Sequence, residues 1–310
     1  MDYSKVLVTG GSGMVGRHLQ EILPDAIYIA SKDYDLTFPS DVESMYFKYQ
    51  PKVVIHLAAK VGGIIDNINH PSGYFEENVL MNTNMVSGAR MHGVKRFIGI
   101  LSTCIYPDVV DEYPMTEDML HNGAPTPTNF SYGYAKRCMA VHIDACNKEH
   151  GTQYQYLTPC NLYGEYDKWG ENSHFVAALI KKIITTHNNG GEFIKLFGTG
   201  KPLRQFMYAE DLAKVIKYVI DNDITDSFNV ATPDNLSIKE IARIALGVFK
   251  ERGETTIKGF AYDTTKPDGQ FRKDVSIDRM KSIIPEFEIT SLRDGIRRTI
   301  DSVLNEQIPI

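Results

Sequence analysis

Three glycines at a spacing of three residues constrain the fold of this chain more than any other feature of its sequence. Gly10, Gly13 and Gly16 follow a short apolar stretch, residues 5–9, and open a helical pattern at residues 14–23. Glycine lets the backbone turn tightly after a strand and lets a helix pack closely against it. The spacing therefore predicts a strand, a tight turn and a helix, which form the first part of a βαβ unit.

Strand patterns and helical patterns alternate through the first half of the chain. The apolar periodicity predicts strands at residues 5–9, 26–30, 53–57, 96–101 and 154–159, and helices at residues 14–23, 41–49, 73–92 and 132–150. This alternation is typical of an α/β fold with a doubly wound parallel sheet, the Rossmann architecture.

The alternation loosens after residue 164, where Pro, Gly and charged residues become frequent. Further helices are expected at residues 173–187, 210–221 and 292–304, and further strands at residues 194–197 and 228–231. We expect a nucleotide-binding Rossmann domain of residues 1–164 with a returning segment at 206–231. A smaller C-terminal α/β substrate domain is expected from residues 165–205 and 232–310.

Local patterns predict two helix starts and one long loop. Ser40 with Glu43, and Ser237 with Glu240, have the spacing of a capping box, in which each side chain accepts a hydrogen bond from the other residue's backbone. Residues 108–131 show little periodicity, and loops longer than ~12–15 residues are usually functional or disordered. We expect this loop to cover a substrate, with disorder as the alternative.

Composition excludes several classes of function. The 310 residues are 43% hydrophobic and 23% charged, and the net charge is −6. Binding to nucleic acid or to a membrane surface requires an excess of Lys and Arg over a broad face, so neither partner is expected. The chain starts without an apolar leader and holds no apolar run near the ~18 residues of a membrane helix. These features predict a cytoplasmic protein.

The four cysteines form neither a Cys-x-x-Cys pair nor a metal-ligand spacing with the nine histidines. No metal site is therefore predicted. Cys138 and Cys146 have apolar neighbours on the helix predicted at residues 132–150, and both are expected to be packing residues.

The glycine turn is expected to hold the pyrophosphate of a dinucleotide, because free N–H groups at a helix start favour an anion. The expected contacts are Gly10, Gly11, Ser12, Gly13, Met14, Val15 and Gly16. An acid at the end of the second strand would bind the ribose and repel a 2′-phosphate. Ser31 and Lys32 stand there and can hold that phosphate, so NADP is expected. Asp33 and Asp35 follow closely and leave NAD open.

Tyr132 and Lys136 are four residues apart on a predicted helix, so their side chains lie on one face. A positive charge beside a phenol lowers its pKa and lets it exchange a proton near neutral pH. Ser102 ends the fourth predicted strand, where residues of a parallel sheet line the ligand crevice, and can hydrogen-bond a carbonyl together with Tyr132. These residues predict carbonyl and alcohol chemistry with a nicotinamide dinucleotide.

The glycine turn, Ser102-Thr103 and the Tyr132-x-x-x-Lys136 pattern resemble the extended short-chain dehydrogenase/reductase family. Longer segments resemble its branch of NADPH-dependent 3,5-epimerase/4-reductases, which act on GDP-4-keto-6-deoxy-D-mannose. These segments lie at residues 56–63, 102–107, 161–164, 172–174, 198–206 and 266–269 and include Asn172-Ser173-His174. The resemblance implies NADPH as the cofactor and a GDP-sugar as the substrate.

The resemblance also implies residue roles. Spacing alone favours Cys104 and His174 as packing residues, whereas the resemblance makes Cys104 a base and His174 an acid in the epimerisation. Ser102 and Tyr132 then act on the ketone oxygen, and Lys136 binds the nicotinamide ribose. Implied further cofactor contacts are Leu57, Ala58, Ala59, Leu101, Ser102, Tyr132, Lys136, Pro159, Asn161, Leu162 and His174. Implied substrate contacts are Asn161, Lys182, Phe197, Arg204, Asp263 and Lys266.

Three alternatives stay open at this point. A 4-epimerase or a 4,6-dehydratase uses the same Tyr-x-x-x-Lys pattern, and a non-catalytic NADP-sensing scaffold would use the same fold.

The helices at residues 73–92 and 132–150 form a four-helix dimer contact in relatives, so a homodimer is expected. Their apolar residues Val79, Met81, Met85, Met139 and Val141 permit that contact.

Overall fold

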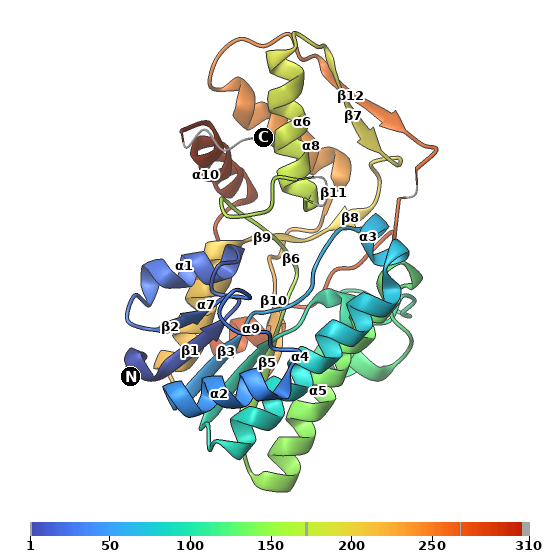
Figure 1. The fold of residues 1–310 in the computed structure, drawn as a ribbon. Coiled ribbons are helices and arrows are strands. Elements are labelled where there is room, and N and C mark those ends of the chain that lie inside the picture. The colour runs from blue at the N-terminus through green and yellow to red at the C-terminus, as the bar shows by residue number, and fades with distance from the viewer. Residues whose placement is uncertain (1, 171–172, 267, 306–310) are drawn as a thin grey trace.

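The computed structural model describes residues 2–170, 173–266 and 268–305, and it is an α/β fold built on one six-stranded sheet (Figure 1). The order across the sheet is β10-β5-β4-β3-β1-β2, and every neighbouring pair is parallel. The strands are β1 Val6–Thr9, β2 Ile27–Ile29, β3 Val53–His56, β4 Arg96–Ile100, β5 Gln153–Pro159 and β10 Phe228–Val230. This order confirms the predicted doubly wound Rossmann sheet.

The strand order places a crevice between β1 and β3. The chain runs from β1 outward to β2 and then crosses back to β3 on the other side of β1. Connections that leave in opposite directions put their loops on opposite sides of the strand ends, and ligands bind in the gap between those loops. The loops after β1, β3 and β4 therefore border the expected site.

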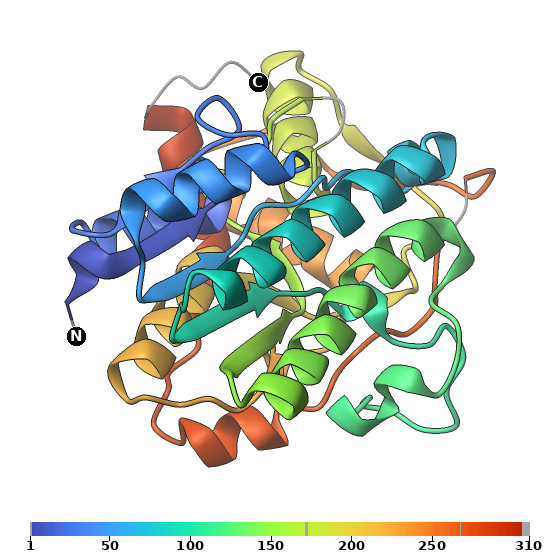
Figure 2. The same ribbon diagram turned by 60° about the horizontal axis from the view of Figure 1, so that its bottom comes forward.

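Helices cover both faces of the sheet. α1 Met14–Ile22 and α7 Ala209–Asp221 pack against each other on one face. α2 Pro39–Tyr49, α4 Pro71–Met91 and α5 Phe130–His150 lie side by side on the other face (Figure 2). Right-handed crossovers require this division, because connections that run in opposite directions along the sheet emerge on opposite faces.

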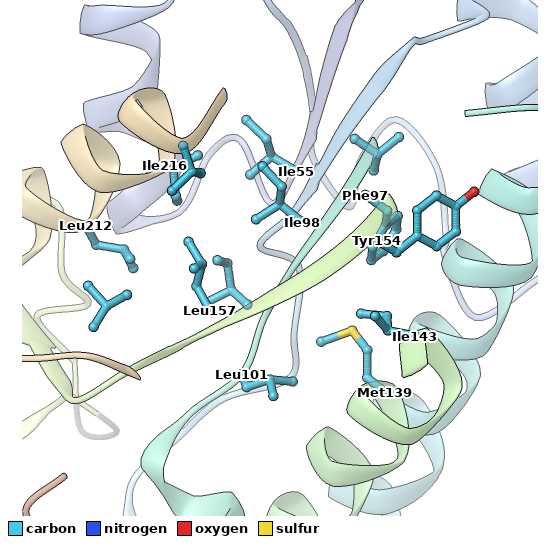
Figure 3. Close-up of a cluster of buried hydrophobic side chains, with 14 of the residues drawn as sticks. Ile55, Phe97, Ile98, Leu101, Met139, Ile143, Tyr154, Leu157, Leu212 and Ile216 are labelled. Carbon is cyan, nitrogen blue, oxygen red and sulfur yellow. The ribbon is translucent and has the colours of Figure 1, made fainter. Parts of the chain in front are cut away.

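The main core lies between the sheet and its helices. Figure 3 shows Leu157 of β5 between Met139 of α5 and Leu212 of α7, and all three side chains are at most 1% exposed. Burying one such side chain contributes roughly 1.5–3 kcal/mol. Strands buried on both faces explain why the sequence shows continuous apolar runs there rather than alternation.

A second core lies in the upper part of Figure 1. It is formed by α6 Phe175–Asn188, α8 Ile238–Lys250 and α10 Leu292–Asn305, with Ile180, Ile241 and Ile296 fully buried. Three two-stranded pairs complete this part: β6 Asn161–Tyr163 with β9 Phe206–Tyr208, β7 Phe193–Phe197 with β12 Gly259–Asp263, and β8 Leu203–Arg204 with β11 Leu236–Ser237. The helix α9 Asp278–Ile283 packs instead on β10 and the first core.

The local predictions had mixed outcomes. The capping box at Ser237 and Glu240 is confirmed at the start of α8. The box at Ser40 and Glu43 is wrong, because Pro39 is already in α2 and the cap is Phe38. Proline fixes φ near the helical value and is favoured in the first turn, so the helix starts one residue before Ser40. Helix α3, Ile64–Asn69, was not predicted.

The long loop at residues 108–131 is ordered and partly buried, so the disorder alternative is wrong. It holds two short 3-10 helices, η3 Glu117–His121 and η4 Pro127–Asn129. Met115 is fully buried and pairs with Val275.

Cys146 is buried in the core as predicted. Cys138 is exposed because it faces away from the sheet, so the packing role predicted for Cys138 is wrong.

Across the described residues, no helix is both long and apolar enough to cross a lipid bilayer.

Candidate active site

The glycine turn packs too tightly for side chains. Gly10 has a φ of +72°, and a Cβ there would lie 2.8 Å from the backbone nitrogen of Ala58 in the loop after β3. A Cβ on Gly16 would lie 2.5 Å from the carbonyl oxygen of Gly10. Helix α1 begins at Met14, and its N-cap residue, Gly13, has no side chain that could cap the first N–H groups of the helix. The turn thus leaves helix N–H groups open beside a bare backbone surface, which fits a pyrophosphate.

The end of β2 favours a 2′-phosphate over a free ribose. The Asp33 carboxylate accepts a hydrogen bond from the backbone of Ala30 at 2.9 Å, and Asp35 accepts hydrogen bonds from Thr37. Both acids therefore stabilise local turns. Ser31 and Lys32 are exposed beside them, as phosphate ligands need to be.

Tyr132 and Ser102 meet at the carboxyl end of β4. Ser102 caps the short 3-10 helix η2, Thr103–Ile105, and its Oγ accepts a hydrogen bond from the Cys104 backbone at 3.3 Å. Tyr132 lies in the first turn of α5 and its ring stands edge-on to Tyr74. Gly133 permits this approach, because a Cβ there would lie 2.5 Å from the Cys104 carbonyl oxygen.

The predicted lowering of the Tyr132 pKa by Lys136 is wrong for this structure. Burial, reinforced by the nearby Cys104, raises the pKa of Tyr132 above its ordinary value, and hydrogen bonding with Ser102 opposes that rise only in part. Burial also lowers the pKa of Lys136 to about 7. Its Nζ donates to the carbonyl oxygen of Ile100 at 2.8 Å. Both residues lie on α5 as the spacing predicted, but the spacing did not reveal that Lys136 is fully buried and Tyr132 partly buried.

A buried polar chain links the glycine turn to α5, and sequence reasoning missed it. His56 contacts Thr9 Oγ1 through Nδ1 at 2.7 Å and Asn82 Oδ1 through Nε2 at 3.0 Å. Asn82 donates to the carbonyl oxygen of Ala135, the residue before Lys136. Burial, and then the charge of Lys136, lower the pKa of His56 to about 3, so its ring is neutral. This chain ties the end of β1 to the helix that carries Tyr132 and Lys136.

Cys104 has two nitrogen neighbours that the sequence did not indicate. Its Sγ accepts hydrogen bonds from Asn129 Nδ2 at 2.7 Å and from Lys273 Nζ at 2.8 Å. Burial raises the pKa of the Cys104 thiol, but the Lys273 charge and the hydrogen bonds from Lys273, Ser102 and Asn129 outweigh burial and lower it below its ordinary value. A lowered pKa is what a thiol base requires.

His174 is paired with an acid that the sequence analysis did not select. His174 caps α6, and its Nδ1 lies 2.7 Å from Oδ1 of the buried Asp167. The hydrogen bond to Asp167 raises the pKa of His174, partly offset by burial. Within the described ranges no hydrogen bond or ion pair joins His174 to Cys104, so their action on one substrate stays a prediction. Asn172, of the Asn-Ser-His motif, lies outside the described residues.

Four of the implied substrate residues gather around β7 and β12. The Nζ atoms of Lys182 and Lys266 lie 4.6 and 5.9 Å from the centre of the Phe197 ring, which is 58% exposed. Asp263 forms an ion pair with Lys195 at 3.0 Å. A hydrogen bond from Thr265, together with Lys195, lowers the Asp263 pKa to about 2. An exposed ring flanked by cations can take a flat, anionic ligand such as a nucleotide.

The other implied residues lie nearer the junction of the two cores. Arg204 lies on β8. Burial is the main influence on its pKa and lowers it, whereas the negative charges of Cys104 and Asp268 raise it in part. Asn161, on β6, donates from Nδ2 at 2.9 Å to the carbonyl oxygen of Gln205, which directly precedes the paired strand β9. Pro159, which ends β5, and Leu162 of β6 frame the same junction, and Leu57, Ala59 and Leu101 follow the ends of β3 and β4.

The chain is similar to known proteins in both sequence and fold. Residues 6–231 match the NAD dependent epimerase/dehydratase family. A GDP-L-fucose synthase from Dictyostelium discoideum is 35% identical over 95% of this chain and 93% of its own length. A GDP-L-colitose synthase from Yersinia pseudotuberculosis is 35% identical over 98% of this chain and 99% of its own. The solved structure of a GDP-L-fucose synthetase from Naegleria fowleri bound to NADP is 30% identical, with a TM-score of 0.85 over 97% of this chain and 94% of that one.

Proposed function

The chain belongs to the NAD dependent epimerase/dehydratase family, and we propose that it converts GDP-4-keto-6-deoxy-D-mannose to GDP-L-fucose with NADPH as the reductant. Relatives with that activity in their names match nearly the whole chain. One structural observation carries the proposal. The sulfur of Cys104 accepts hydrogen bonds from two nitrogen donors, and Cys104 lies near Ser102 and Tyr132 at the carboxyl end of β4. A simple ketone reductase needs only the two hydroxyls, whereas an epimerase also needs a base.

In the proposed epimerisation, Cys104 acts as a thiolate and takes a proton from carbon 3 or carbon 5, which both neighbour the ketone. The electron pair of the broken C–H bond moves to the ketone oxygen, where the hydroxyls of Ser102 and Tyr132 stabilise the enolate. His174 then protonates the same carbon from the opposite face, and the hydrogen bond to Asp167, which raises the His174 pKa, favours the protonated form that this role needs. The result is inversion of that carbon.

In the proposed reduction, Tyr132 is the acid. NADPH, when bound, supplies the hydride for carbon 4. Tyr132 gives its phenol proton to the oxygen at that carbon, and the raised pKa keeps the phenol protonated until then. Ser102 holds the oxygen, and Lys136 binds the nicotinamide ribose.

The residues that would hold the two ligands lie in separate parts of the fold. The turn at residues 10–16, with Ser31 and Lys32, fits NADP because its bare backbone and open helix start leave room for phosphate. Phe197 with its flanking lysines, together with Arg204, is proposed for the nucleoside diphosphate. We propose that residues 1–164 and 206–231 form the nucleotide domain and that residues 165–205 and most of 232–310 form the substrate domain. The predicted boundary is wrong for the segment around α9, because Val275, Ile277, Met280 and Ile284 pack in the first core.

Product identification tests the function. The purified protein is incubated with GDP-4-keto-6-deoxy-D-mannose and NADPH, and the sugar is identified by NMR. GDP-L-fucose with stoichiometric oxidation of NADPH is expected. GDP-rhamnose would indicate reduction without inversion. A product without net NADPH oxidation would indicate a 4-epimerase or a 4,6-dehydratase, and tight NADPH binding without turnover would indicate a sensing scaffold.

Formation of GDP-L-colitose is the second candidate, because a relative of that name is as similar as the first. The two candidates differ in the substrate, since colitose lacks the 3-hydroxyl group. Offering both 4-keto sugars in competition separates them by the ratio of their kcat/KM values.

Exchange with solvent tests the role of Cys104. In D2O and without NADPH, the wild-type protein should incorporate deuterium at carbons 3 and 5 of the keto sugar. Cys104→Ala removes the proposed base, so deuterium uptake should fall by about 10²-fold or more. Exchange at the wild-type rate would remove Cys104 from the mechanism, and unchanged NADPH affinity shows that the site is intact.

We propose that the protein is a cytoplasmic homodimer. Leu80 on α4 is 48% exposed and Val141 on α5 is 50% exposed, on two helices that pack against each other. Apolar side chains exposed on neighbouring helices are typical of an interface. Met85 and Met139, two of the apolar residues said to permit this contact, are buried in the protein's own core and cannot contribute to it.

A further inference from the structure

We propose that Lys273 and Asn129 hold Cys104 as a thiolate in the free enzyme, and that Lys273 is a positioning residue for the base of the epimerisation. The inference rests on the proposed function, because it concerns the residue proposed as the base. It adds a residue from a distant segment that none of the sequence motifs contains.

The hydrogen bonds around the sulfur fit a thiolate better than a thiol. Two N–H donors reach Cys104 Sγ at 2.7 and 2.8 Å, one from Asn129 and one from Lys273. A neutral thiol is a weak acceptor, whereas a thiolate is a full anion that accepts several hydrogen bonds. An ammonium within hydrogen-bond distance also stabilises the anion by its charge.

The remaining groups around the sulfur do not oppose this charge state. Arg204 is a second cation whose field reaches Cys104, Ser102 contributes a hydroxyl, and Tyr132 stays neutral because its own pKa is raised. The direction of the Cys104 pKa, below its ordinary value, agrees with the geometry.

The fold holds Lys273 in place from both sides. The carbonyl oxygen of Arg272 accepts a hydrogen bond from the Tyr113 hydroxyl at 3.1 Å. The carbonyl oxygen of Asp274 accepts one from the Met115 backbone at 2.9 Å. Asn129 belongs to the same long loop as these two partners, residues 108–131. The long loop and the strap, residues 272–276, therefore place both donors on the sulfur together, which gives the loop a second task beside the predicted covering of the substrate.

Alkylation of Cys104 by iodoacetamide tests the proposal without any sugar. The assay uses a Cys138→Ser background, because Cys138 is exposed while Cys146 and Cys160 are buried. The rate at Cys104 is followed by peptide mass spectrometry from about pH 5 to about pH 10. Lys273→Gln should react about tenfold more slowly at neutral pH, with its profile moved to higher pH. Lys273→Arg should restore much of the reactivity, and Lys281→Gln, an exposed control on α9, should match the parent.

A wild-type profile in Lys273→Gln would overturn the proposal. A second measurement covers the case in which that variant does not fold. Thiolates absorb near 240 nm and thiols do not. The parent should therefore exceed Cys104→Ser in absorbance at about pH 7, and equal absorbance would also overturn the proposal. Neither measurement depends on the substrate, so failure of the product test leaves both interpretable.

Discussion

Burial dominates the ionisation of the polar side chains at the end of β4. It raises the pKa of Tyr132 and lowers that of Lys136 to about 7, so both residues tend toward their neutral forms in the free protein. Cys104 differs because the Lys273 charge and the hydrogen bonds from Lys273, Ser102 and Asn129 outweigh the effect of burial on its pKa. Burial thus controls the pKa values of Tyr132 and Lys136 but not that of Cys104, for reasons that lie outside their own sequence positions.

His174 should make stability depend on pH. Its folded pKa is raised, mainly by the hydrogen bond to Asp167. The contribution of His174 to the free energy of unfolding is therefore fully present below its unfolded-state pKa of ~6.5. It is lost as pH rises through the pKa of the folded state. Asp167→Asn should lower the free energy of unfolding more at about pH 5.5 than at about pH 8.5, measured by urea unfolding.

Asp118→Asn is the control for this prediction, because Asp118 has a side chain that is 89% exposed. Its effect should be small and equal at the two pH values. If Asp167→Asn lowers the free energy of unfolding equally at both pH values, the effect comes from packing or from the hydrogen bond that the Lys168 backbone N–H donates to Asp167, and not from His174.

At the scale of elements, the turn between β1 and α1 has no room for a side chain at Gly16. A Cβ on Gly16 would meet the carbonyl oxygens of Gly10 and Gly11 at 2.5 and 2.6 Å, and backbone atoms cannot rotate away. Gly16→Ala should therefore lower the free energy of unfolding by about 1–3 kcal/mol. It should also weaken NADPH binding, measured by fluorescence titration, because the turn must open.

Gly247→Ala is a matched control with the opposite sign. Gly247 is also helical, in α8, and an added Cβ would meet only the flexible end of Arg293, at 3.9 Å. Alanine should stabilise this helix by up to about 1 kcal/mol and leave NADPH affinity unchanged. Equal destabilisation by the two substitutions would contradict the steric argument.

The two predicted capping boxes form a second matched pair. Glu240 accepts a hydrogen bond from the Ser237 backbone at 2.8 Å, and Ser237 accepts one from the Glu240 backbone at 3.2 Å. Ser237→Ala should cost about 1 kcal/mol in chemical unfolding. Ser40→Ala should change stability by less than about 0.5 kcal/mol, because Ser40 is an exposed residue inside α2. Similar losses would show that the box contributes nothing.

At the scale of the whole molecule, the proposed dimer can be dissociated by charge. Leu80→Glu with Val141→Glu places carboxylates on the exposed face of α4 and α5, and burying them in an interface costs several kcal/mol. Sedimentation velocity should show monomers for this variant and dimers for the wild type. Leu304→Glu, on the distant helix α10, should stay dimeric. A monomeric wild-type protein, or a dimer that survives the double substitution, would refute the proposed contact.

The long loop and the strap at residues 272–276 show how distant segments build one site. Met115 pairs with Val275, and this pairing brings Lys273 over Cys104, 169 residues earlier in the chain. No local pattern marks Lys273 or Asn129. Lys273 is followed by Asp274 in a polar segment, a pattern that is also typical of solvent-exposed surface residues.

The sequence by itself determined the features that depend on neighbours along the chain. Apolar periodicity defined the strands and helices of the Rossmann sheet, the glycine spacing defined the turn at Gly10, and the Ser237 box defined the start of α8. Tertiary structure alone decided the burial of Tyr132 and Lys136, the partner of His174 and the donors on Cys104. The physical reason is that hydrogen bonds and periodicity within an element act over a few residues, whereas desolvation and charge depend on which distant segments the fold brings together.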